Sequence, residues 1–460
     1  MKQHKDKSVL VLGLGETGLS MVRWLSAQSA HLRVADTRNI PPGLAEVGKY
    51  VPAGQIYCGN FNDALFDGIE LVAISPGVPL RDPAVARAVA RGIEVVGDIE
   101  LFAQSLPKDN RPHILAITGA NGKTTVTSMV EHLCKAAGKD AVAAGNISPA
   151  VLDVVLERGV NQPEVWVLEL SSFQLETTYN LNADAATVLN ISEDHLDRYA
   201  DMNEYSAAKA RIFSGCGVQV LNRDDERSMS MARKDCKIIT FGLNLPEREG
   251  DFGIENIDGE IWLVQGKQRL LKASELQVAG MHNVANALAA LALSRAIEFP
   301  MPRLLDALRS FKGLPHRVER VAEINGVTYY DDSKGTNVGA TIAALQGLGC
   351  KAVLIAGGEG KGQDFTPLKP VVAQFARAVV LIGRDAPQIT AALNGCGVDV
   401  LCAVDMEDAV RLSAHLAKSG DAVLLSPACA SFDMFRNYEH RAEVFVDAVH
   451  GLAKGKSWAH

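Results

Sequence analysis

Short apolar runs alternate with stretches of helical periodicity along this chain. The runs at residues 8–13, 113–118 and 165–170 are each followed by a segment whose apolar positions fit one face of a helix. Such alternation is typical of parallel sheets covered by helices, so the pattern predicts an α/β fold. The other strands it predicts are residues 32–36, 71–75, 94–97, 186–190, 218–222, 327–331, 352–356, 378–382, 398–401 and 422–425. Helices are expected near residues 17–28, 126–137 and 283–296.

Two breaks divide this pattern into three parts. A polar linker is expected near residues 97–112, and a second boundary at Lys312-Gly313-Leu314-Pro315. The chain has 460 residues, and a single core stops growing at about 250–300 residues. We therefore expect domains at residues 1–97, 98–313 and 314–460, the last an entirely parallel α/β unit. Within the second, residues 252–271 alternate, and Asp258-Gly259 predicts a hairpin turn.

Composition and charge exclude several classes of protein. Hydrophobic residues make up 47% and charged residues 22% of the chain, which is typical of a globular protein. The net charge of −8 gives no general attraction to nucleic acid or to an anionic membrane, so anions need local sites. No apolar run approaches the roughly 20 residues of a membrane-spanning helix, and residues 1–8 show no signal-peptide pattern. The eight cysteines form no C-x-x-C pair, so we expect reduced thiols in the cytosol.

A glycine-rich loop follows the first predicted strand. The sequence G-L-G-E-T-G at residues 13–18 opens a helix, and Asp36 ends the next strand. Glycines permit a tight turn and close approach to a phosphate, and a helix N-terminus offers N–H groups. The loop fits NAD, with Asp36 on a ribose hydroxyl, and fits a nucleotide-sugar pyrophosphate equally well. The same loop also occurs as pure packing.

A second phosphate loop stands between the strand at 113–118 and the following helix. Its sequence is G-A-N-G-K-T-T at residues 119–125. In such loops the backbone N–H groups hold a triphosphate, Lys123 reaches its outer phosphates, and Thr124 can bind Mg²⁺. Ile117 replaces the first glycine of the usual pattern, so the loop is a shortened variant. Glu169, at the end of a strand, is placed for Mg²⁺ but would also suit an ion pair.

These motifs resemble those of the Mur ligases, ATP-dependent amide ligases of peptidoglycan precursor synthesis. The resemblance spans the chain, and its motifs are T-G-A-N-G-K-T-T at 118–125, L-E-L-S-S-F-Q-L at 168–175, N-I-S-E-D-H-L-D-R at 190–198, L-P-H-R at 314–317, D-S-K-G-T-N at 332–337 and L-S-P-A-C-A-S at 425–431. The last three resemble the members that add D-glutamate. The resemblance implies a Rossmann-like UDP-binding domain, a central P-loop-type ATPase domain with a mainly parallel sheet, and a Rossmann-like C-terminal domain that binds D-glutamate.

The resemblance also implies a reaction. ATP would phosphorylate the terminal carboxylate of UDP-N-acetylmuramoyl-L-alanine, and the amine of D-glutamate would attack the acyl phosphate. ADP and phosphate would leave after a tetrahedral intermediate. Two Mg²⁺ ions and a CO₂-derived carbamate on Lys209 are implied, in a monomer of the bacterial cytoplasm that binds no nucleic acid and inserts in no membrane. Taken alone, Lys209 would be interpreted as a solvated lysine; as a carbamate it becomes an anionic metal ligand.

Matching positions assign residues to each ligand. For the UDP substrate they are Gly15, Glu16, Thr17, Asp36, Thr37, Arg38, Ser75, Asn146 and His195. For ATP they are Gly119, Ala120, Asn121, Gly122, Lys123, Thr124, Thr125, Asn283, Asn286, Arg317, Asp332 and Lys334. For D-glutamate they are Thr336, Lys361, Ser431, Phe432 and Tyr438, the last standing where the family often has Phe. The metal ligands are Thr124, Glu169, His195 and carbamylated Lys209. The catalytic set is Lys123, Glu169, His195, Lys209, Arg317 and Lys334.

Other interpretations stay open on these residues alone. His195 could be a surface loop residue, Asn283 and Asn286 helix caps, and residues 331–334 a solvated charged loop. The chain could be a Mur-type ligase for another amino acid, or an ATP-hydrolysing switch protein. An NAD-dependent oxidoreductase fits the first glycine loop but leaves the loop at 119–125 without purpose.

Overall fold

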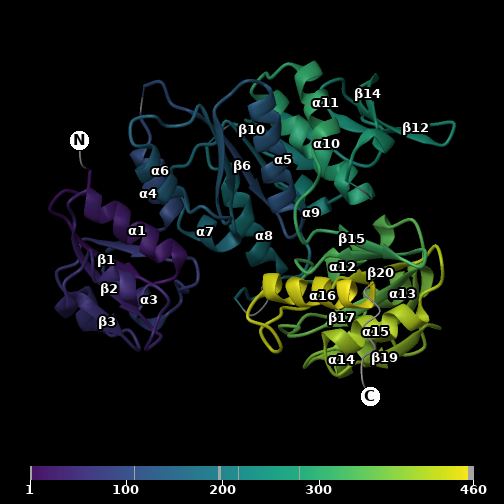
Figure 1. Ribbon diagram of the computed structural model, residues 1–460. Coiled ribbons are helices and arrows are strands. Elements are labelled where there is room, and N and C mark those ends of the chain that lie inside the picture. Colours follow the sequence, from purple (N-terminus) through teal and green to yellow (C-terminus); the bar gives the residue numbers. More distant parts are fainter. Residues whose placement is uncertain (1–2, 108, 195–197, 216, 279, 454–460) are drawn as a thin grey trace.

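Three α/β domains follow one another along the chain in the computed structural model (Figure 1). The structure describes residues 3–107, 109–194, 198–215, 217–278 and 280–453. In Figure 1 the first domain lies at the left in purple, the second at the centre and top, and the third at the lower right. The predicted fold class is confirmed. Within the described residues, no helix is long and apolar enough to cross a membrane.

The first domain is a five-stranded parallel sheet in the order β3-β2-β1-β4-β5. Its strands are β1 (Ser8–Leu12), β2 (His31–Asp36), β3 (Ile56–Cys58), β4 (Leu71–Ile74) and β5 (Glu94–Val96). Its helices are α1 (Glu16–Ala27), α2 (Leu44–Val47) and α3 (Pro83–Ala90). The strand order reverses between β1 and β4. A ligand crevice is expected outside the carboxyl ends of the strands at such a point, and the glycine loop follows β1 there.

The central domain holds a six-stranded parallel sheet in the order β11-β10-β9-β6-β8-β7 and a small antiparallel sheet, β12-β13-β14. The parallel strands are β6 (His113–Thr118), β7 (Ala141–Gly145), β8 (Val165–Glu169), β9 (Ala185–Val188), β10 (Val218–Asn222) and β11 (Ile238–Phe241). The antiparallel strands are β12 (Phe252–Ile257), β13 (Glu260–Gln265) and β14 (Gln268–Lys272). The helices are α4 (Asp98–Ser105), α5 (Lys123–Ala136), α6 (Val151–Arg158), α7 (Ser172–Glu176), α8 (Met202–Ala210), α9 (Glu226–Ser230), α10 (Met281–Ala296) and α11 (Met301–Ser310). The predicted hairpin turn at Asp258-Gly259 is confirmed.

The third domain contains a six-stranded sheet in the order β15-β16-β20-β17-β18-β19. Its strands are β15 (Glu319–Ile324), β16 (Val327–Asp331), β17 (Ala352–Gly357), β18 (Ala376–Ile382), β19 (Asp399–Cys402) and β20 (Ala422–Leu425). Its helices are α12 (Val338–Gly347), α13 (Leu368–Phe375), α14 (Ala386–Ala392), α15 (Met406–Leu416) and α16 (Tyr438–Ala453). The expectation of an entirely parallel unit is wrong at one edge, because β15 runs antiparallel to β16. Asn325 and Gly326 both have positive φ in this hairpin, and so short a connection can join only antiparallel strands.

Two further expectations are corrected by the structure. The linker expected at residues 97–112 contains helix α4, whose apolar side chains Ile99, Leu101 and Phe102 are buried. The expectation of reduced thiols is wrong for Cys236, which is disulfide-bonded. The absence of a C-x-x-C pair excludes only close pairing in sequence, and folding can bring distant cysteines together.

A buried carboxylate begins α4, where the first two domains join. Asp98 is 1% exposed; its Oδ2 accepts a hydrogen bond from Gln174 Nε2 at 3.0 Å, and its Oδ1 has no partner. Burial raises the pKa of Asp98 from 3.8 to about 6. A raised carboxyl pKa means that ionising Asp98 destabilises the folded state, and this cost grows as the pH rises from about 4 to about 6.

We therefore expect Asp98→Asn to stabilise the protein, and to do so more at high pH. Raising the pKa of Asp98 from 3.8 to about 6 corresponds to a cost of about 3 kcal/mol at pH 8 and to roughly half of that at pH 5. Thermal unfolding at the two pH values measures the difference, with Glu94→Gln on an exposed residue as the control. An equal midpoint for Asp98→Asn and the parent protein at pH 8 would contradict the expectation.

Candidate functional site

A cavity of about 450 Å³ lies between the first and central domains. Eight of the residues expected to bind the UDP substrate line it: Gly15, Glu16, Thr17, Asp36, Thr37, Arg38, Ser75 and Asn146. The ninth, His195, lies outside the described residues. The sequence did not single out Gln174, which also lines the cavity, nor the loop at 147–150. Residues distant in sequence thus share one cavity, as the resemblance implied.

Asp36 organises the loops around this cavity. Its Oδ2 accepts hydrogen bonds from the Leu14 backbone N–H (2.7 Å) and Arg38 Nη2 (2.7 Å). Its Oδ1 accepts from the Arg38 backbone N–H (2.8 Å) and Nε (2.9 Å). Burial alone would raise the pKa of Asp36, but these hydrogen bonds hold it below its ordinary value. Because all four acceptor positions are used, Asp36 fixes the glycine loop and presents Arg38.

The glycines of this loop differ in role. A Cβ on Gly18 would lie 1.8 Å from the Gly13 carbonyl oxygen, so only glycine permits this packing of α1. Ser75 Oγ donates a hydrogen bond to the same oxygen at 3.1 Å. Gly15 has nothing within 4 Å of such a Cβ and faces the cavity. Packing and ligand approach are therefore divided between two glycines of one motif.

The phosphate loop at 119–125 joins β6 to α5 and is fixed by a residue from the end of a neighbouring strand. Asn190 Oδ1 accepts the Asn121 backbone N–H at 2.8 Å, and Asn190 Nδ2 donates to the Asn121 carbonyl at 3.1 Å. Lys123 Nζ donates to the carbonyls of Gly119 and Ala120 at 2.8 and 2.9 Å. Sequence reasoning placed Asn190 only inside a motif. Its position directly after β9 was the signal that it meets the loop after β6.

A second cavity, of about 360 Å³, opens between this loop and the third domain. Its lining includes eight of the residues expected to bind ATP: Asn121, Gly122, Thr125, Asn283, Asn286, Arg317, Asp332 and Lys334. Asn283 and Asn286 lie inside α10 rather than capping it, and Asn286 Nδ2 donates to Asn283 Oδ1 at 3.1 Å. A Cβ on Gly122 would lie 2.7 Å from Asn286 Oδ1, so glycine lets the helix approach the loop. His282 and Phe241 complete the wall and were not predicted.

Lys209 is buried beside the phosphate loop. It is 2% exposed, its Nζ donates to the Gly119 carbonyl at 2.9 Å, and it lies 4.7 Å from the centre of the Tyr205 ring. Burial, and then the nearby charge of Lys123, lower the pKa of Lys209 well below its ordinary value. The interpretation of Lys209 as a solvated lysine is therefore wrong. The lowered pKa favours the neutral amine over the ammonium form.

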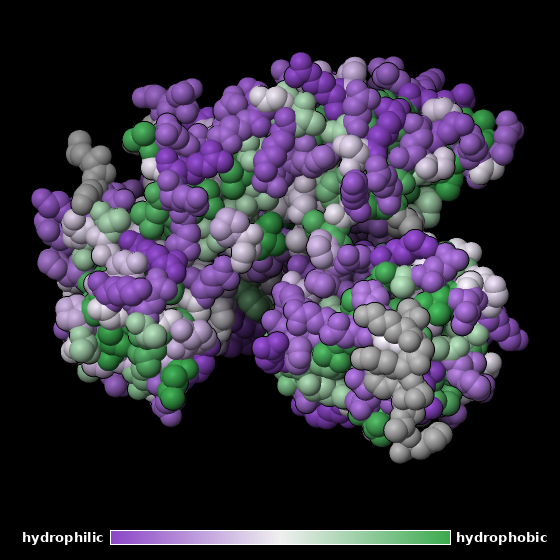
Figure 2. All heavy atoms as spheres, viewed as in Figure 1, coloured by the Kyte–Doolittle hydropathy of each residue, from purple (hydrophilic) through white to green (hydrophobic). Residues whose placement is uncertain are grey.

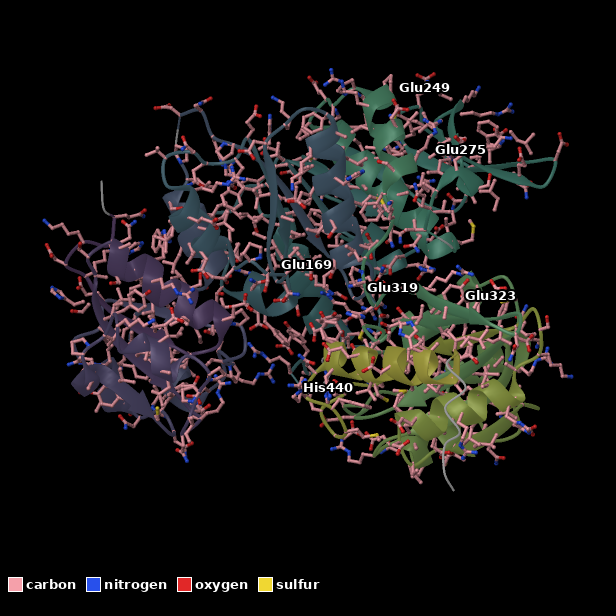
Figure 3. The ribbon with its side chains drawn as sticks, viewed as in Figure 1. Glu169, Glu249, Glu275, Glu319, Glu323 and His440 are labelled. Atoms are coloured by element: carbon pink, nitrogen blue, oxygen red, sulfur yellow. The ribbon has the colours of Figure 1, made fainter. Side chains whose placement is uncertain are left out.

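Glu169 ends β8 close to both cavities. Its side chain is 2% exposed, and Oε1 accepts a hydrogen bond from Asn146 Nδ2 at 2.9 Å. Its other oxygen, Oε2, is buried without a partner. Figure 3 shows Glu169 at the edge of the central domain that faces the third domain. A buried carboxylate oxygen without a partner is costly unless a cation or donor meets it, so Glu169 suits a hard cation such as Mg²⁺.

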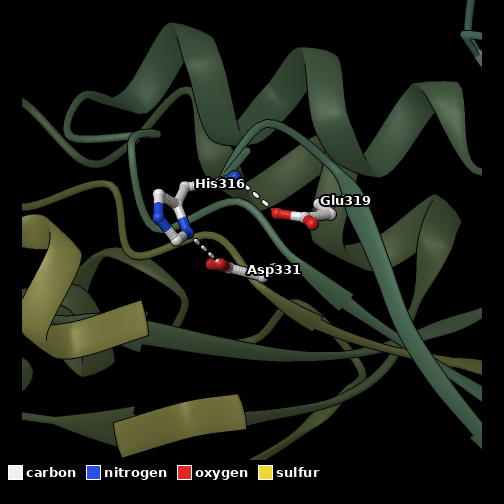
Figure 4. A group of neighbouring side chains, drawn as sticks. All are labelled: His316, Glu319 and Asp331. Carbon is white, nitrogen blue, oxygen red and sulfur yellow. Dashed lines mark hydrogen bonds and ion pairs between the residues drawn. The ribbon is translucent and has the colours of Figure 1, made fainter. Parts of the chain in front are cut away.

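Arg317 of the third domain directly follows His316, whose bonds to two neighbouring side chains are shown in Figure 4. His316, with φ of 60°, donates its backbone N–H to Glu319 Oε2 at 2.9 Å, and its Nδ1 lies 2.6 Å from Asp331 Oδ2. These three side chains could hold a metal by type, but the bonds among them already account for their arrangement. Their effect is to fix the turn that carries Arg317, which lines the cavity and whose Nε has no hydrogen-bond partner.

Asp332 and Lys334 lie just after the carboxyl end of β16. Ser426 Oγ donates to Asp332 Oδ2 at 2.6 Å, and burial raises the pKa of Asp332 to about 7. Lys334 Nζ lies 5.2 Å from the centre of the Tyr438 ring, and burial and the nearby Arg317 lower its pKa. Arg317 and Lys334 line this cavity, and Lys123 lies in the adjoining phosphate loop, so basic side chains that suit a polyphosphate gather here in an acidic chain.

The residues expected to bind D-glutamate gather at one sheet edge. Thr336, Lys361 and Ser431 follow β16, β17 and β20, which are adjacent in the sheet, and Tyr438 begins α16. Ser431 is buried, whereas Lys361 and Phe432 are exposed. Carboxyl ends of neighbouring parallel strands are a usual place for a ligand. The topology thus brings the loops together and leaves the side chain of Lys361 accessible at this edge.

Arg441, which the sequence analysis missed, holds two of these loops together. It is fully buried, and its guanidinium donates to the Ser333 carbonyl (2.7 Å), Ser333 Oγ (2.9 Å) and the Cys429 carbonyl (3.1 Å). Burial lowers the pKa of Arg441 to about 10. A buried arginine without a bonded carboxylate had no signal in the sequence, because two of its three acceptors are backbone carbonyls and the third is a serine hydroxyl.

The two cavities and the sheet edge face the middle of the molecule. Figure 2 shows the surface hollowed there, between the first domain and the third, and notched between the second and the third. This arrangement defines a class of protein: a three-domain nucleotide-binding enzyme that holds a phosphate loop between two further ligand-binding domains.

Comparison with known families agrees with this class. Three family descriptions match successive parts of the chain: "Mur ligase MurD-like, N-terminal domain" at residues 7–97, "Mur ligase middle domain" at 117–294 and "Mur ligase, glutamate ligase domain" at 316–429. The chain belongs to the Mur ligase family.

Curated relatives match nearly the whole chain. A UDP-N-acetylmuramoylalanine--D-glutamate ligase from Methylobacillus flagellatus is 58% identical over 99% of both chains. The same-named protein of Nitrosomonas europaea is 56% identical over 97% of this chain and 96% of its own. Among solved structures, a UDP-N-acetylmuramate-alanine ligase from Thermotoga maritima has a TM-score of 0.60 at 21% identity, covering 97% of this chain and 99% of its own. At this sequence identity, the likeness shows a shared fold and nothing more.

Proposed function

We propose that the chain is an ATP-dependent ligase that joins D-glutamate to UDP-N-acetylmuramoyl-L-alanine during synthesis of peptidoglycan precursors. The observation that carries the proposal is the high identity, over nearly the full length, to relatives that bear this activity in their names. The two cavities and the sheet edge supply one site for each of three substrates. The enzyme acts as a monomer in the bacterial cytoplasm.

The first cavity takes the UDP part of the acceptor, and the second takes ATP. The substrate carboxylate reaches toward Glu169 and the phosphate loop, and its oxygen attacks the γ-phosphorus while the bond to ADP breaks. The D-glutamate amine then attacks the acyl carbon, phosphate leaves, and the amine proton passes to solvent. The positive charges of Lys123, Arg317 and Lys334 stabilise the negative charge that is transferred between the oxygens.

The residues beside the phosphate loop fit magnesium. Glu169 offers a buried oxygen that lacks a partner, and Thr124 offers a hydroxyl at the start of α5. Oxygen donors of this kind are those that Mg²⁺ prefers. When bound, Mg²⁺ neutralises phosphate charge and orients the nucleotide. His195 remains part of the proposed metal set but lies outside the described residues.

The environment of Lys209 supports a carbamate. Its lowered pKa favours the neutral amine, which can attack CO₂ and lose one proton to form an N–COO⁻ group. The product is an anion beside the phosphate loop, where an ammonium group would repel a metal ion. A second Mg²⁺ site formed with this carbamate completes the proposal.

D-glutamate binds at the edge formed by the loops after β16, β17 and β20. Lys361 meets one of its carboxylates, while Thr336 and Ser431 offer hydroxyl donors, and Phe432 and Tyr438 border the pocket. Pairing of a carboxylate with a cation and hydroxyl donors gives both affinity and orientation. The amine is thereby held toward the acyl phosphate.

The deciding experiment follows phosphate release from ATP with Mg²⁺ and UDP-N-acetylmuramoyl-L-alanine. D-glutamate is compared with L-glutamate, D-alanine, L-alanine and meso-diaminopimelate. Release that requires D-glutamate, with a matching ligated product, is expected. Release with another amino acid would move the assignment to a different Mur-type ligase, and release independent of any amino acid would leave an ATPase.

Arg38 offers a test of the UDP site. Arg38→Ala is expected to raise the KM for the UDP substrate about tenfold or more, with kcat within about twofold, because a charged hydrogen bond to the carrier is lost far from the reacting atoms. Steady-state kinetics with varied UDP substrate measure this. Arg87→Ala, on an exposed residue paired with Asp63, is the matched control in the same domain. A fall in kcat with unchanged KM would contradict the placement.

A further inference from the structure

Among the described residues, one hydrogen bond between side chains joins the third domain to the phosphate loop. Asn337 Nδ2 donates a hydrogen bond to Asn121 Oδ1 at 3.0 Å, from the start of α12 to the loop between β6 and α5. Both amides are oriented by other bonds. Asn337 Oδ1 accepts the Ala340 backbone N–H at 2.9 Å as the cap of α12, and Asn121 Nδ2 points to Ser192 Oγ at 3.4 Å. The donor and the acceptor in the contact are therefore fixed.

The fit around this contact is close. Asn337 is 7% exposed. A Cβ on Gly339, the second residue of α12, would lie 3.1 Å from Asn121 Nδ2 and 3.4 Å from Ser192 Oγ. Glycine at this position thus lets the end of α12 approach the loop, at some cost in helix propensity. Both the Asn337 cap and Gly339 therefore allow the start of α12 to lie close to the phosphate loop.

The start of α12 is also tied to the loops of the proposed amino-acid site. Gln363 Oε1 accepts the Val338 backbone N–H at 2.9 Å. Gln363 Nε2 donates to the carbonyls of Gly360 (3.0 Å) and Ala428 (2.8 Å). Gly360 immediately precedes Lys361, and Ala428 lies in the loop after β20 that also carries Ser431. One glutamine therefore connects both loops to the helix end that touches the phosphate loop.

We propose that Asn337 is a positioning residue that docks the amino-acid-binding edge of the third domain onto the phosphate loop, through Asn121. Asn337 itself contacts neither substrate in this role. It fixes the loop that holds ATP when the third domain is in place, and so couples the amino-acid site to phosphoryl transfer. The proposal rests on the proposed function for the identity of the amino acid, but the contact itself does not depend on it.

Asn337→Ser separates docking from folding. Serine caps helices as well as asparagine does, but is too short to reach Asn121. We expect kcat/KM for ATP to fall about fivefold to tenfold, the range for one hydrogen bond, with the KM for the UDP substrate unchanged. The unfolding midpoint should stay within about 2 °C of the parent. Asp405→Ser is the matched control, because it exchanges the cap of α15 in the same domain away from the loop.

A double-mutant cycle with Asn121→Ser tests whether the two amides act together. If the contact carries the effect, the double variant is no slower than Asn121→Ser alone. Gly339→Ala is a second probe that favours the helix while pushing it from the loop, and it should also lower kcat/KM for ATP severalfold. Unchanged kinetics in Asn337→Ser, or effects of the two substitutions that simply multiply, would overturn the proposal.

Nucleotide affinity keeps this test distinct from that of the proposed function. Calorimetry with a non-hydrolysable ATP analogue and Mg²⁺ needs no amino acid, and Asn337→Ser is expected to weaken binding about fivefold. If the parent protein showed no dependence on D-glutamate, the proposed function would fail while this difference in affinity remained. Equal affinity in Asn337→Ser and the parent would instead count against docking.

Discussion

Lys209→Met is expected to lower D-glutamate-dependent phosphate release by about a hundredfold to a thousandfold while making the protein more stable. The loss follows because methionine fills the space but cannot form the carbamate, and so removes a charged group beside the transferred phosphoryl group. The gain is expected for the protein without CO₂ and Mg²⁺, because an unmodified buried lysine with a lowered pKa destabilises the folded state at every pH below its ordinary value, as more protons bind to the unfolded chain. The unfolding midpoint should rise by about 2–4 °C.

Labelling separates the carbamate from other roles of Lys209. With ¹³C-bicarbonate, the parent protein should show a carbamate carbon signal that Lys209→Met lacks. In Lys209→Ala, formate or acetate can enter the vacated space and should restore part of the activity. Lys267→Ala, on an exposed lysine of the hairpin between β13 and β14, should leave activity unchanged. Full activity in Lys209→Met would remove the carbamate from the mechanism.

Glu169→Gln is expected to have a comparable effect on rate through the metal. Glutamine can still accept the hydrogen bond from Asn146, so the local structure is kept, but it replaces the buried oxygen without a partner by an amide. We expect kcat to fall about a hundredfold to a thousandfold, and the Mg²⁺ concentration for half-maximal rate to rise about tenfold or more. A magnesium titration of phosphate release measures both quantities.

The same strand supplies a control for this substitution. Glu164 immediately precedes β8, is exposed and pairs with Lys139, so Glu164→Gln changes a carboxylate at the other end of the strand. Its rate and magnesium dependence should match the parent. An unchanged magnesium dependence in Glu169→Gln, with a normal fold by circular dichroism, would show that Glu169 is not a ligand.

Much of the fold could be predicted from periodicity, because parallel strands buried on both faces form continuous apolar runs. The strands β10, β16 and β20 have the predicted bounds. The pattern missed β15, whose half-exposed residues alternate weakly, although Asn325-Gly326 signalled its hairpin. The pattern also missed α4. The prolines that follow this helix indicated a linker, and the start of that linker was predicted too early in the chain.

The candidate site could be predicted where the chemistry is carried by charged side chains in motifs. Eight of the expected residues share each cavity, since loops after neighbouring strands converge whatever their distance in sequence. Asn190, Gln363 and Arg441 escaped prediction for a common reason. Each acts mainly on backbone groups of another loop, and such partners become known only when the chain is folded.

Within the described residues, the central domain alone borders both cavities, because one lies at its junction with the first domain and the other at its junction with the third. Under the proposed function, the energy-converting part of the molecule is thus separate from the parts that choose what is joined. On that assignment, a new amino acid could be recruited in evolution by changing loops of the third domain while carrier recognition stays intact. For engineering, exchange of whole terminal domains becomes a practical route to altered products, provided that the Asn121–Asn337 junction is preserved in each hybrid.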